Sequence, residues 1–298
     1  MTASDELPPR VLPLRAWSLA WLAFLIAMPG AGIARAGAPL PPALARIAAV
    51  LPETVAGDLD RRIRARRLVR GLLQVHYRRL APAGMAFFAG KVVFMRGRVR
   101  MDGGFYLGRR EVSTGQFVDF WRGRKRGANG SGAVARWHGR PVDLPVVRVS
   151  LVEAREFAAA HGARLPLRAE LQAASTCGGR YRYPWGDRFD PSRVNSLEAG
   201  LGRPVPVQSR SGGGSALGIL HLLGNVAEWT DSVAGKRRGR NALHLVVGGS
   251  YRTPARHKSF TTYRLAANAY LPDVGFRLAK SLPALPASIA LPAPPRAP

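Results

Sequence analysis

Cysteine and histidine, the side chains that most often bind transition metals, are scarce in this chain. Its 298 residues include six histidines and one cysteine, Cys177, which we expect to be a buried free thiol. His221, His244 and His257 lie in the C-terminal half. They could converge with Glu228 on a non-haem iron site, which needs two histidines and a carboxylate. No recognisable ligand spacing connects them, so we expect core or surface histidines and keep iron as the alternative.

Ser250 lies in a glycine-rich turn and not in a catalytic motif. Gly248 and Gly249 precede it and Tyr251 follows it, so the Gly-x-Ser-x-Gly pattern of a serine nucleophile is missing. The sequence also contains neither a phosphate loop nor a dinucleotide fingerprint. The two glycines are better explained by a tight turn and a close approach of two backbone segments.

Aromatic and basic residues are frequent after this turn, between positions 251 and 270. Such side chains suit an anionic or glycan ligand, which they bind through charge-assisted hydrogen bonds and stacking. The alternative is that they are ordinary solvated loop residues. The candidate ligand surface consists of Ser250, Tyr251, Arg256, His257, Lys258, Tyr263 and Arg264.

The elements that must position these residues are short. Strand-like runs at 92–95, 104–107 and 145–149 alternate with turns. Helices are predicted at about 114–122 and 168–175. Ser150 and Glu153 form a capping-box pattern that opens a further helix ending near residue 160. With 33 glycines and 24 prolines, the composition favours a loop-rich fold over a helix bundle.

Eight motifs follow one another between positions 104 and 277, and their order resembles that of the formylglycine-generating enzyme family, also called sulfatase-modifying factors. Each motif alone is weak, but eight in this order make a chance match very rare. They are Gly104-Phe105-Tyr106-Leu107-Gly108-Arg109-Arg110-Glu111-Val112-Ser113 with Gln116-Phe117, Pro145-Val146-Val147-Arg148-Val149-Ser150 with Ala154, Arg164-Leu165-Pro166 with Ala169-Glu170, Tyr183-Pro184-Trp185-Gly186-Asp187, Leu217-Gly218-Ile219-Leu220, Gly224-Asn225-Val226-Ala227-Glu228-Trp229-Thr230, Gly248-Gly249-Ser250-Tyr251, and Arg264 with Gly275-Phe276-Arg277.

The resemblance implies an irregular, loop-rich α+β fold of the C-type-lectin type over residues 84–280. It also implies calcium, held through backbone oxygens at Gly224 and Val226 and the carboxylate of Glu228. Calcium prefers oxygen ligands, whereas His221 stands where relatives carry Asn or Asp, and an imidazole suits calcium poorly. The alternative is that Glu228 pairs with an arginine in the core.

The chemistry of the founding enzyme is not expected here. In that enzyme two cysteine thiolates after the Gly-Gly-Ser segment hold copper, which soft thiolates bind well. This chain has no cysteine from Gly178 to Pro298, so we expect no copper and no formylglycine formation. Relatives such as the ergothioneine sulfoxide synthases use non-haem iron held by an added helical domain, for which the N-terminal region supplies only His76.

Two functions therefore remain open at the level of sequence. The first is a binding or accessory protein of the cell envelope with an anionic, glycan or protein ligand. The alternative is a divergent non-haem metal oxidoreductase that matures a peptide, protein or metabolite in the periplasm, similar to the family members that mature pyoverdine.

The N-terminus has the pattern of an export signal. A twelve-residue apolar run at 17–28 follows Arg10 and Arg15, and Ala34-Arg35-Ala36 forms a cleavage pattern before Gly37. We therefore expect residues 1–36 to be a signal peptide and the protein to be periplasmic or secreted. The alternative is an uncleaved membrane anchor at 16–34.

Residues 37–83 are predicted to form a linker and a basic amphipathic helix from about 53 to 80. We expect its apolar stripe to dock on the rest of the protein, and contact with an anionic membrane is the alternative. Residues 281–298, rich in Pro and Ala, are predicted to be a disordered tail. The stripe consists of Ala65, Leu68, Val69, Leu72, Leu73, Tyr77 and Leu80.

The chain is strongly basic, with 45 Lys and Arg against 18 Asp and Glu and a net charge of +27. Such an excess attracts nucleic acid, anionic lipid or acidic glycans. Its arginines are spread along the sequence, so genomic base composition is an equal explanation. Export from the cytoplasm argues against nucleic acid as the partner.

Overall fold

The computed structural model describes residues 40, 42–51, 58–95, 98–124, 135–235, 242–256 and 260–285. The chain divides into two compact units. The smaller comprises Met1–His76, Val92–Met101 and Ala284–Pro298, and the larger comprises Tyr77–Lys91 and Asp102–Pro283. The predicted signal peptide, and all of the predicted tail except residues 281–285, lie outside the described residues. Of the described helices, none combines the length and the apolar character that crossing a membrane requires.

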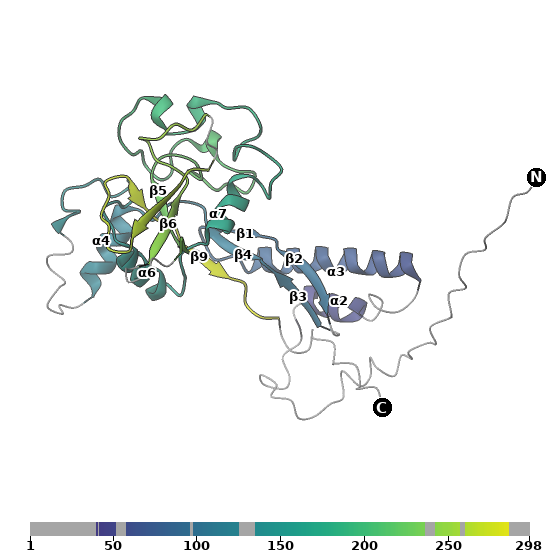
Figure 1. Cartoon of the computed structure of the whole chain (residues 1–298). Helices are drawn as coiled ribbons and strands as arrows, with labels where there is room; N and C mark the ends of the chain where they lie inside the picture. Colours follow the sequence, from purple (N-terminus) through teal and green to yellow (C-terminus); the bar gives the residue numbers. More distant parts are fainter. Residues whose placement is uncertain are drawn as a thin grey trace, which may run out of the picture. The chain divides into compact units, whose positions relative to one another are not determined.

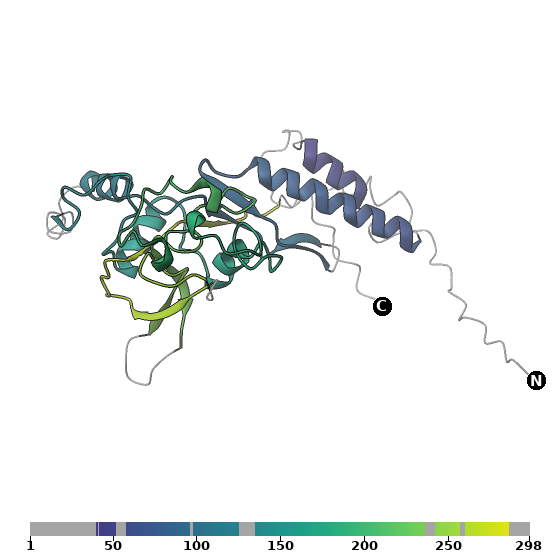
Figure 2. The ribbon, with the colours of Figure 1, turned by 90° about the horizontal axis from the view of Figure 1, so that it is seen from above.

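The described residues of the smaller unit include two α-helices and a two-stranded sheet. Helix α2 spans Pro42–Val50, and α3 spans Leu59–Arg79 and continues into the larger unit. The two helices lie side by side in both ribbon views (Figures 1 and 2). Strands β2 (Lys91–Met95) and β3 (Arg98–Asp102) pair with each other.

Most of the predicted apolar stripe of α3 is buried. Five of its seven members are buried, which supports docking of this stripe inside the protein, and the two exceptions are Leu68 and Leu80, which are exposed. The helix begins after Asp58, whose carboxylate accepts a hydrogen bond from the backbone N–H of Arg61 at 2.7 Å. The buried residues are Ala65, Val69, Leu72, Leu73 and Tyr77.

The larger unit is built on two small sheets. In the first, β1 (Met85–Phe88) and β9 (Ala279–Ser281) pair antiparallel with the two edges of β4 (Phe105–Gly108), so the first and last strands of the unit share one sheet. The second has the order β7-β6-β5-β8. Its strands are β5 (Ala227–Val233), β6 (Leu243–Val247), β7 (Thr262–Ala266) and β8 (Val274–Gly275), and only the β5–β8 pair is parallel.

Three α-helices whose bounds fall within the described part of the larger unit agree with the sequence predictions. They are α4 (Thr114–Gly123), α6 (Leu151–Ala160) and α7 (Arg168–Ser175). The capping box at Ser150 and Glu153 is confirmed, and α4 begins with a second one at Ser113 and Gln116. The loops between α7 and β5 contain three short 3-10 turns, η2 (Pro191–Arg193), η3 (Leu197–Ala199) and η4 (Ser211–Gly213).

The aromatic core of the larger unit lies between α4, α6 and the four-stranded sheet. Phe117 of α4, Phe157 of α6 and Trp229 of β5 are fully or almost fully buried in one cluster. The indole N–H groups of Trp137 and Trp229 donate to the carbonyls of Val147 and Val149 at 2.7 and 2.8 Å. Both buried donors are therefore satisfied, as a core of this kind requires.

The strand predicted at 145–149 is wrong. Its valines are buried, yet only Pro145 forms a bridge, to Ser113. Arg148 has φ +58°, a left-handed conformation that breaks an extended strand. The backbone N–H groups of Val146 and Arg148 donate to the separate segments of Val112 and Leu271. The apolar run signalled burial correctly but not strand pairing.

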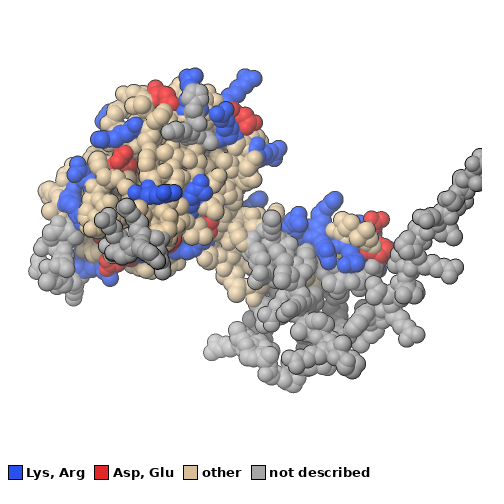
Figure 3. Space-filling view, in the orientation of Figure 1, with Lys and Arg blue, Asp and Glu red and all other residues tan. Residues whose placement is uncertain are grey.

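The architecture is mixed α+β and loop-rich, and the N-terminal helices α2 and α3 precede the first strand in the sequence. Figure 2 shows how much of the larger unit is loop. The basic side chains on the visible face of the larger unit are scattered and do not form one stripe (Figure 3).

Candidate functional site

A buried arginine, Arg277, joins three segments of the larger unit. Its guanidinium forms a two-point ion pair with Glu228 of β5, with N–O distances of 2.7 and 2.6 Å. It also donates to the backbone carbonyls of Gly108, Leu220 and His221 at 2.9–3.1 Å. Both side chains of the ion pair are almost completely buried. Such a pair is well satisfied only because every guanidinium nitrogen has an acceptor.

Next to this ion pair lies a second buried carboxyl group, Glu111. Burial raises the pKa of Glu111 to about 8, an effect that Arg277 opposes and Glu228 reinforces. One carboxyl oxygen accepts a hydrogen bond from the Asn225 amide at 2.9 Å, and the other has no hydrogen-bond partner. Asn225 itself has φ +59°. The larger unit therefore holds a carboxyl that is neutral over much of the physiological pH range.

The calcium site implied by residues 221–228 does not fit this arrangement. Both carboxylate oxygens of Glu228 accept from Arg277, which is the alternative that the sequence left open. Gly224 has φ +73°, and its N–H donates to the carbonyl of Gly248. Val226 is buried. These residues belong to a tight crossing of two backbone segments. Glu228 is the only carboxylate among the implied calcium ligands, so a cation bound there would lie beside the positively charged guanidinium of Arg277.

The three histidines considered as iron ligands are His221, His244 and His257, and the two that the structure describes occupy separate environments. Burial lowers the pKa of His221 to about 4, and the charges of Arg277 and Arg210 act in the same direction. His244 lies on β6, where burial and then Arg155 lower its pKa. Among the described residues, no three His, Cys, Asp or Glu side chains form a group that could hold a metal ion. His257 lies outside the described part of the chain.

Ser250 is a structural residue of the turn that carries the candidate ligand segment. Its hydroxyl donates to the carboxylate of Asp273 at 2.8 Å and accepts from the N–H of Arg252 at 3.2 Å. Its own N–H donates to the hydroxyl of Thr253 at 2.8 Å. The turn needs Gly249, which has φ +71°. It is attached to the buried network because the N–H of Tyr251 donates to the carbonyl of Asn225.

A carboxylate that the sequence did not identify, Glu198, fixes the other end of this segment. Its oxygens accept from the N–H groups of Ala255 and Arg256 at 3.0 and 2.9 Å and from the hydroxyl of Ser196 at 2.6 Å. Burial tends to raise the pKa of Glu198, but these hydrogen bonds outweigh it and hold the pKa at about 2. The hydroxyl of Tyr183 donates to the carbonyl of Arg256. No sequence signal connects Glu198 with Ala255 and Arg256, which are 57 and 58 residues away.

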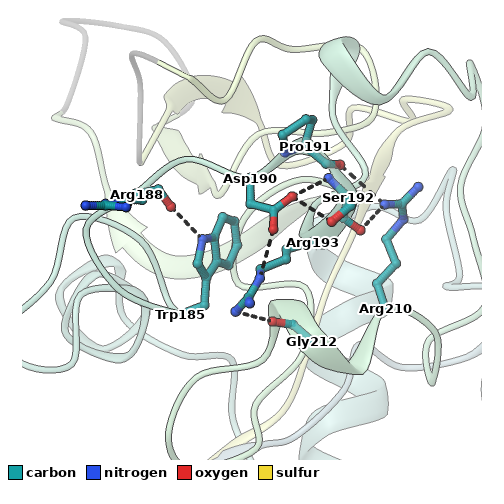
Figure 4. Close-up of polar contacts among 8 residues, drawn as sticks. All are labelled: Trp185, Arg188, Asp190, Pro191, Ser192, Arg193, Arg210 and Gly212. Carbon is teal, nitrogen blue, oxygen red and sulfur yellow. Dashed lines mark hydrogen bonds and ion pairs between the residues drawn. The ribbon is translucent and has the colours of Figure 1, made fainter.

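The loop that carries Tyr183 also presents aromatic rings to the segment. Trp185 stacks on Tyr183 with a centroid distance of 5.5 Å, and the guanidinium of Arg256 lies 5.3 Å from the ring centroid of Phe189. Figure 4 shows how the loop is braced beyond Trp185, whose indole N–H donates to the carbonyl of Arg188 at 2.9 Å.

Asp190 and two arginines continue this bracing (Figure 4). The carboxylate of Asp190 accepts from the N–H and hydroxyl of Ser192 and pairs with Arg193 at 3.1 Å. Arg193 also donates to the carbonyl of Gly212, and Arg210 donates to the carbonyl of Ser192 at 2.6 Å. These contacts connect η2 to the loop around η4, so the aromatic loop is held in place without a sheet.

Two residues of the predicted ligand surface do not lie at the surface. Ser250 and Tyr251 are buried and cannot contact a surface ligand as they stand, which corrects that prediction. Arg256, Tyr263 and Arg264 are exposed. His257 and Lys258 lie outside the described residues, so their positions stay a prediction.

Two neighbouring side chains were missed by the sequence interpretation. Arg252 is exposed, and its guanidinium donates to the hydroxyl of Tyr251 at 3.1 Å. Asp273 accepts a hydrogen bond from the Ser250 hydroxyl. Burial raises the pKa of Tyr263, and the negative charge of Asp273 acts in the same direction. The candidate site thus consists of a rigid turn with the exposed Arg252 and Arg256, the carboxylates Asp273 and Glu198 that fix it, and the exposed Tyr263 and Arg264 of β7.

The family model described as the sulfatase-modifying factor enzyme 1-like domain matches residues 85–282. This match covers more than half of the chain, and the chain belongs to that family. The class of protein expected from the motif order is therefore confirmed. The single cysteine is consistent with a member that lacks the cysteine pair.

Two curated relatives show how varied this family is. Hercynine oxygenase of Mycobacterium tuberculosis is 33% identical over 159 residues, which are 43% of this chain and 37% of that protein. The inactive C-alpha-formylglycine-generating enzyme 2 of Mus musculus is 31% identical over 159 residues, which are 47% of this chain and 50% of that protein. The chain thus spans half or less of the length of these relatives.

A solved structure supports the fold alone. The crystal structure of CarF has a TM-score of 0.53 and 20% sequence identity, and the match covers 68% of this chain and 99% of that one. The larger unit therefore has the C-type-lectin-like fold of the formylglycine-generating enzyme type.

Proposed function

We propose that this protein is an exported binding or accessory member of its family, that its ligand is anionic, and that it does not form formylglycine. The observation that carries the proposal is the rigid turn that follows Gly248. Hydrogen bonds fix both ends of this turn. At one end the hydroxyl of Ser250 donates to Asp273, and at the other the N–H groups of Ala255 and Arg256 donate to Glu198. A surface ordered before the ligand arrives loses little conformational entropy on binding.

The exposed side chains of the turn define the ligand chemistry. Arg252, Arg256 and Arg264 offer guanidinium groups, which bind carboxylate, sulfate or phosphate groups through paired hydrogen bonds. Tyr263 is 37% exposed and adds a ring that a sugar or another flat group can stack on. Two carboxylates lie nearby: Asp273 accepts from Ser250, and Glu198 accepts from the N–H groups of Ala255 and Arg256. Both already have hydrogen-bond donors within the protein, so the exposed guanidinium groups are the charges offered to a ligand.

The ligand test compares a sulfated polysaccharide with uncharged dextran of equal length. The protein is expected to bind the sulfated chain only, and the double variant Arg256→Ser/Tyr263→Ala is expected to bind it at least about tenfold more weakly. The control Arg122→Ser/Arg180→Ser removes two exposed arginines elsewhere on the larger unit, one positive charge more than the test variant. Equal losses of affinity in both variants would show that the sulfated chain is bound by the net positive charge of the protein and not by this turn.

The absence of formylglycine chemistry has its own assay. The protein, loaded with Cu(I), is incubated with a cysteine-containing peptide, and aldehyde formation is followed by mass spectrometry. We expect no product, because the segment after Gly248 contains no thiolate that could hold the copper. An aldehyde formed at more than the rate without protein contradicts the proposal.

The second candidate function is a divergent metal oxidoreductase acting in the maturation of a peptide, protein or metabolite. The likeness to a hercynine oxygenase favours it. Its test is quantification of calcium, copper and iron in the purified protein together with the variants His244→Ala and His257→Ala. Iron or copper in a one-to-one ratio that disappears in either variant would replace the binding role by this one.

Export is the remaining part of the proposal and rests on the N-terminal sequence. Cell fractionation followed by N-terminal sequencing should find the protein outside the cytoplasm and beginning at Gly37. A membrane-bound form that retains residues 16–34 supports the anchored alternative. Full-length protein in the cytoplasm contradicts export.

A further inference from the structure

We propose that the solvent-facing half of α3 is a membrane-binding surface for anionic phospholipid. This half shares only Leu68 with the apolar stripe that the sequence analysis identified, because most of that stripe is buried inside the protein. The proposed surface combines exposed aliphatic side chains with exposed arginines and lies within the smaller unit. Its members are Leu59, Ile63, Arg64, Arg67, Leu68, Arg70 and Val75.

The helical spacing spreads these residues over about half of the circumference of α3, and one row of them follows a single face. Arg64, Leu68, Gly71 and Val75 recur at intervals of four, three and four residues, so they follow one face of the helix. Leu68 and Val75 are each 44% exposed. A Cβ atom built at Gly71, between them, would have no heavy atom within 4 Å. The space beside this face is open.

A second exposed row lies beside the first. Leu59 and Ile63, which are 69% and 46% exposed, are followed one turn later by Arg67. Each of the two rows therefore contains both aliphatic side chains and a guanidinium group. Arginine can bury its aliphatic stem in an interface while its charged end stays at the phosphate level.

The charge of α3 is strongly one-sided. Its 21 residues include eight arginines and a single acid, Asp60, in the first turn. Figure 3 shows blue side chains over the visible part of this helix, with red confined to its N-terminal end. A helix with exposed leucine, isoleucine and valine between arginines suits the headgroup and upper acyl region of an anionic bilayer.

Other partners explain these residues less completely. Nucleic acid would use the arginines but gains nothing from four exposed aliphatic side chains. A second copy of the chain would bring two basic helices together, which costs electrostatic energy. An anionic membrane uses both kinds of side chain at once. The inference does not depend on the ligand function proposed for the larger unit.

The test is co-sedimentation of the full chain with vesicles of phosphatidylcholine, with and without phosphatidylglycerol. Binding to the anionic vesicles is expected, and both Leu68→Ser/Val75→Ser and Arg64→Glu/Arg67→Glu should weaken it by about tenfold or more. The control Arg122→Glu/Arg180→Glu changes the net charge as much as the second variant but lies outside α3. It should weaken binding less than about twofold.

All variants keep the N-terminal apolar run, so any contribution from that run is common to them. Equal binding of all variants, or equal binding to neutral vesicles, would overturn the proposal. So would a DNA duplex that binds more tightly than the vesicles and is insensitive to Leu68→Ser/Val75→Ser. Circular dichroism checks that each variant retains its helix content.

A fluorescent probe gives a second readout that does not depend on affinity. In a Cys177→Ser background, an environment-sensitive dye attached at Val75→Cys should shift to the blue when anionic vesicles are added. The same dye at Arg180→Cys should not shift. A shift at Arg180→Cys and none at Val75→Cys would place the membrane contact elsewhere and overturn the proposal.

Discussion

Among individual residues, Arg277 joins three separate segments of the larger unit. It holds β4 through Gly108, the loop through Leu220 and His221, and β5 through Glu228. Replacing it with methionine would leave the carboxylate of Glu228 buried without a partner. We expect Arg277→Met to lower the free energy of unfolding by about 3–5 kcal/mol. Urea denaturation measures this loss, and the exposed control Arg122→Met should change stability by less than about 0.5 kcal/mol.

Glu111 makes the stability of the fold depend on pH. Burial raises the pKa of this carboxyl from 4.5 to about 8, so the folded state binds more protons than the unfolded state between these values. Its contribution to stability is complete below about pH 4.5 and is lost as the pH rises through 8. His221 acts over a lower range: burial lowers its pKa from 6.5 to about 4, and its contribution is lost as the pH falls through that interval.

The two effects can be separated because only the Glu111 interval extends above pH 6.5. We expect the free energy of unfolding to decrease between pH 6.5 and 8 in the unmodified chain and to decrease less in Glu111→Gln. Glutamine keeps an oxygen that can accept from Asn225 but has no proton to lose. Urea denaturation at closely spaced pH values measures both slopes. Identical slopes would mean that Glu111 does not titrate in this range.

At the scale of elements, the helix starts of the larger unit depend on local signals. In α6 the hydroxyl of Ser150 accepts from the N–H of Glu153 at 3.2 Å, while the Glu153 carboxylate accepts from the N–H of Ser150 at 2.8 Å. We expect Ser150→Ala to lower stability by about 1 kcal/mol. Ser150→Thr, which keeps the hydroxyl, should lose less. Thermal unfolding compares the two, and an equal loss would show that packing of the Ser150 side chain matters more than capping.

Elements with local signals could be predicted from the sequence, and those with distant partners could not. The helix predicted at 168–175 matches α7, and the Ser150 capping box lies where it was expected. Burial at 145–149 was also correct, but the strand was not, because its backbone partners Val112 and Leu271 lie on separate segments. Apolar character indicates burial and does not indicate which segment pairs with which.

The candidate site was predictable to the same limited extent. Motif order placed the turn at Gly248 and identified Arg256, Tyr263 and Arg264, which are exposed. Glu198 was missed because its partners are two backbone N–H groups distant in sequence, which no residue pattern records. The role of Glu228 stayed open between calcium and an ion pair until Arg277, 49 residues later, was seen beside it.

At the scale of the whole molecule, the net charge of +27 must be separated from the proposed site. A chain with this charge attracts any polyanion over long distances, and salt screens that attraction. A bound polyanion also releases counterions, so the logarithm of its affinity falls with the logarithm of salt concentration in proportion to the number of direct ionic contacts. The slope of the logarithm of affinity against the logarithm of salt concentration therefore reports the number of direct ionic contacts. The net charge adds a long-range attraction that is common to all polyanions.

This difference leads to a prediction for the turn after Gly248. We expect Arg256→Ser/Arg264→Ser to reduce the salt slope for sulfated polysaccharide by roughly one for each arginine that contacts it, as phosphate contacts do for DNA. The control Arg122→Ser/Arg180→Ser lowers the net charge by the same amount and should leave the slope unchanged. Titrations at several salt concentrations measure both. If the two double variants reduce the slope equally, the polyanion binds the basic surface as a whole, and the rigid turn would need a ligand of different chemistry.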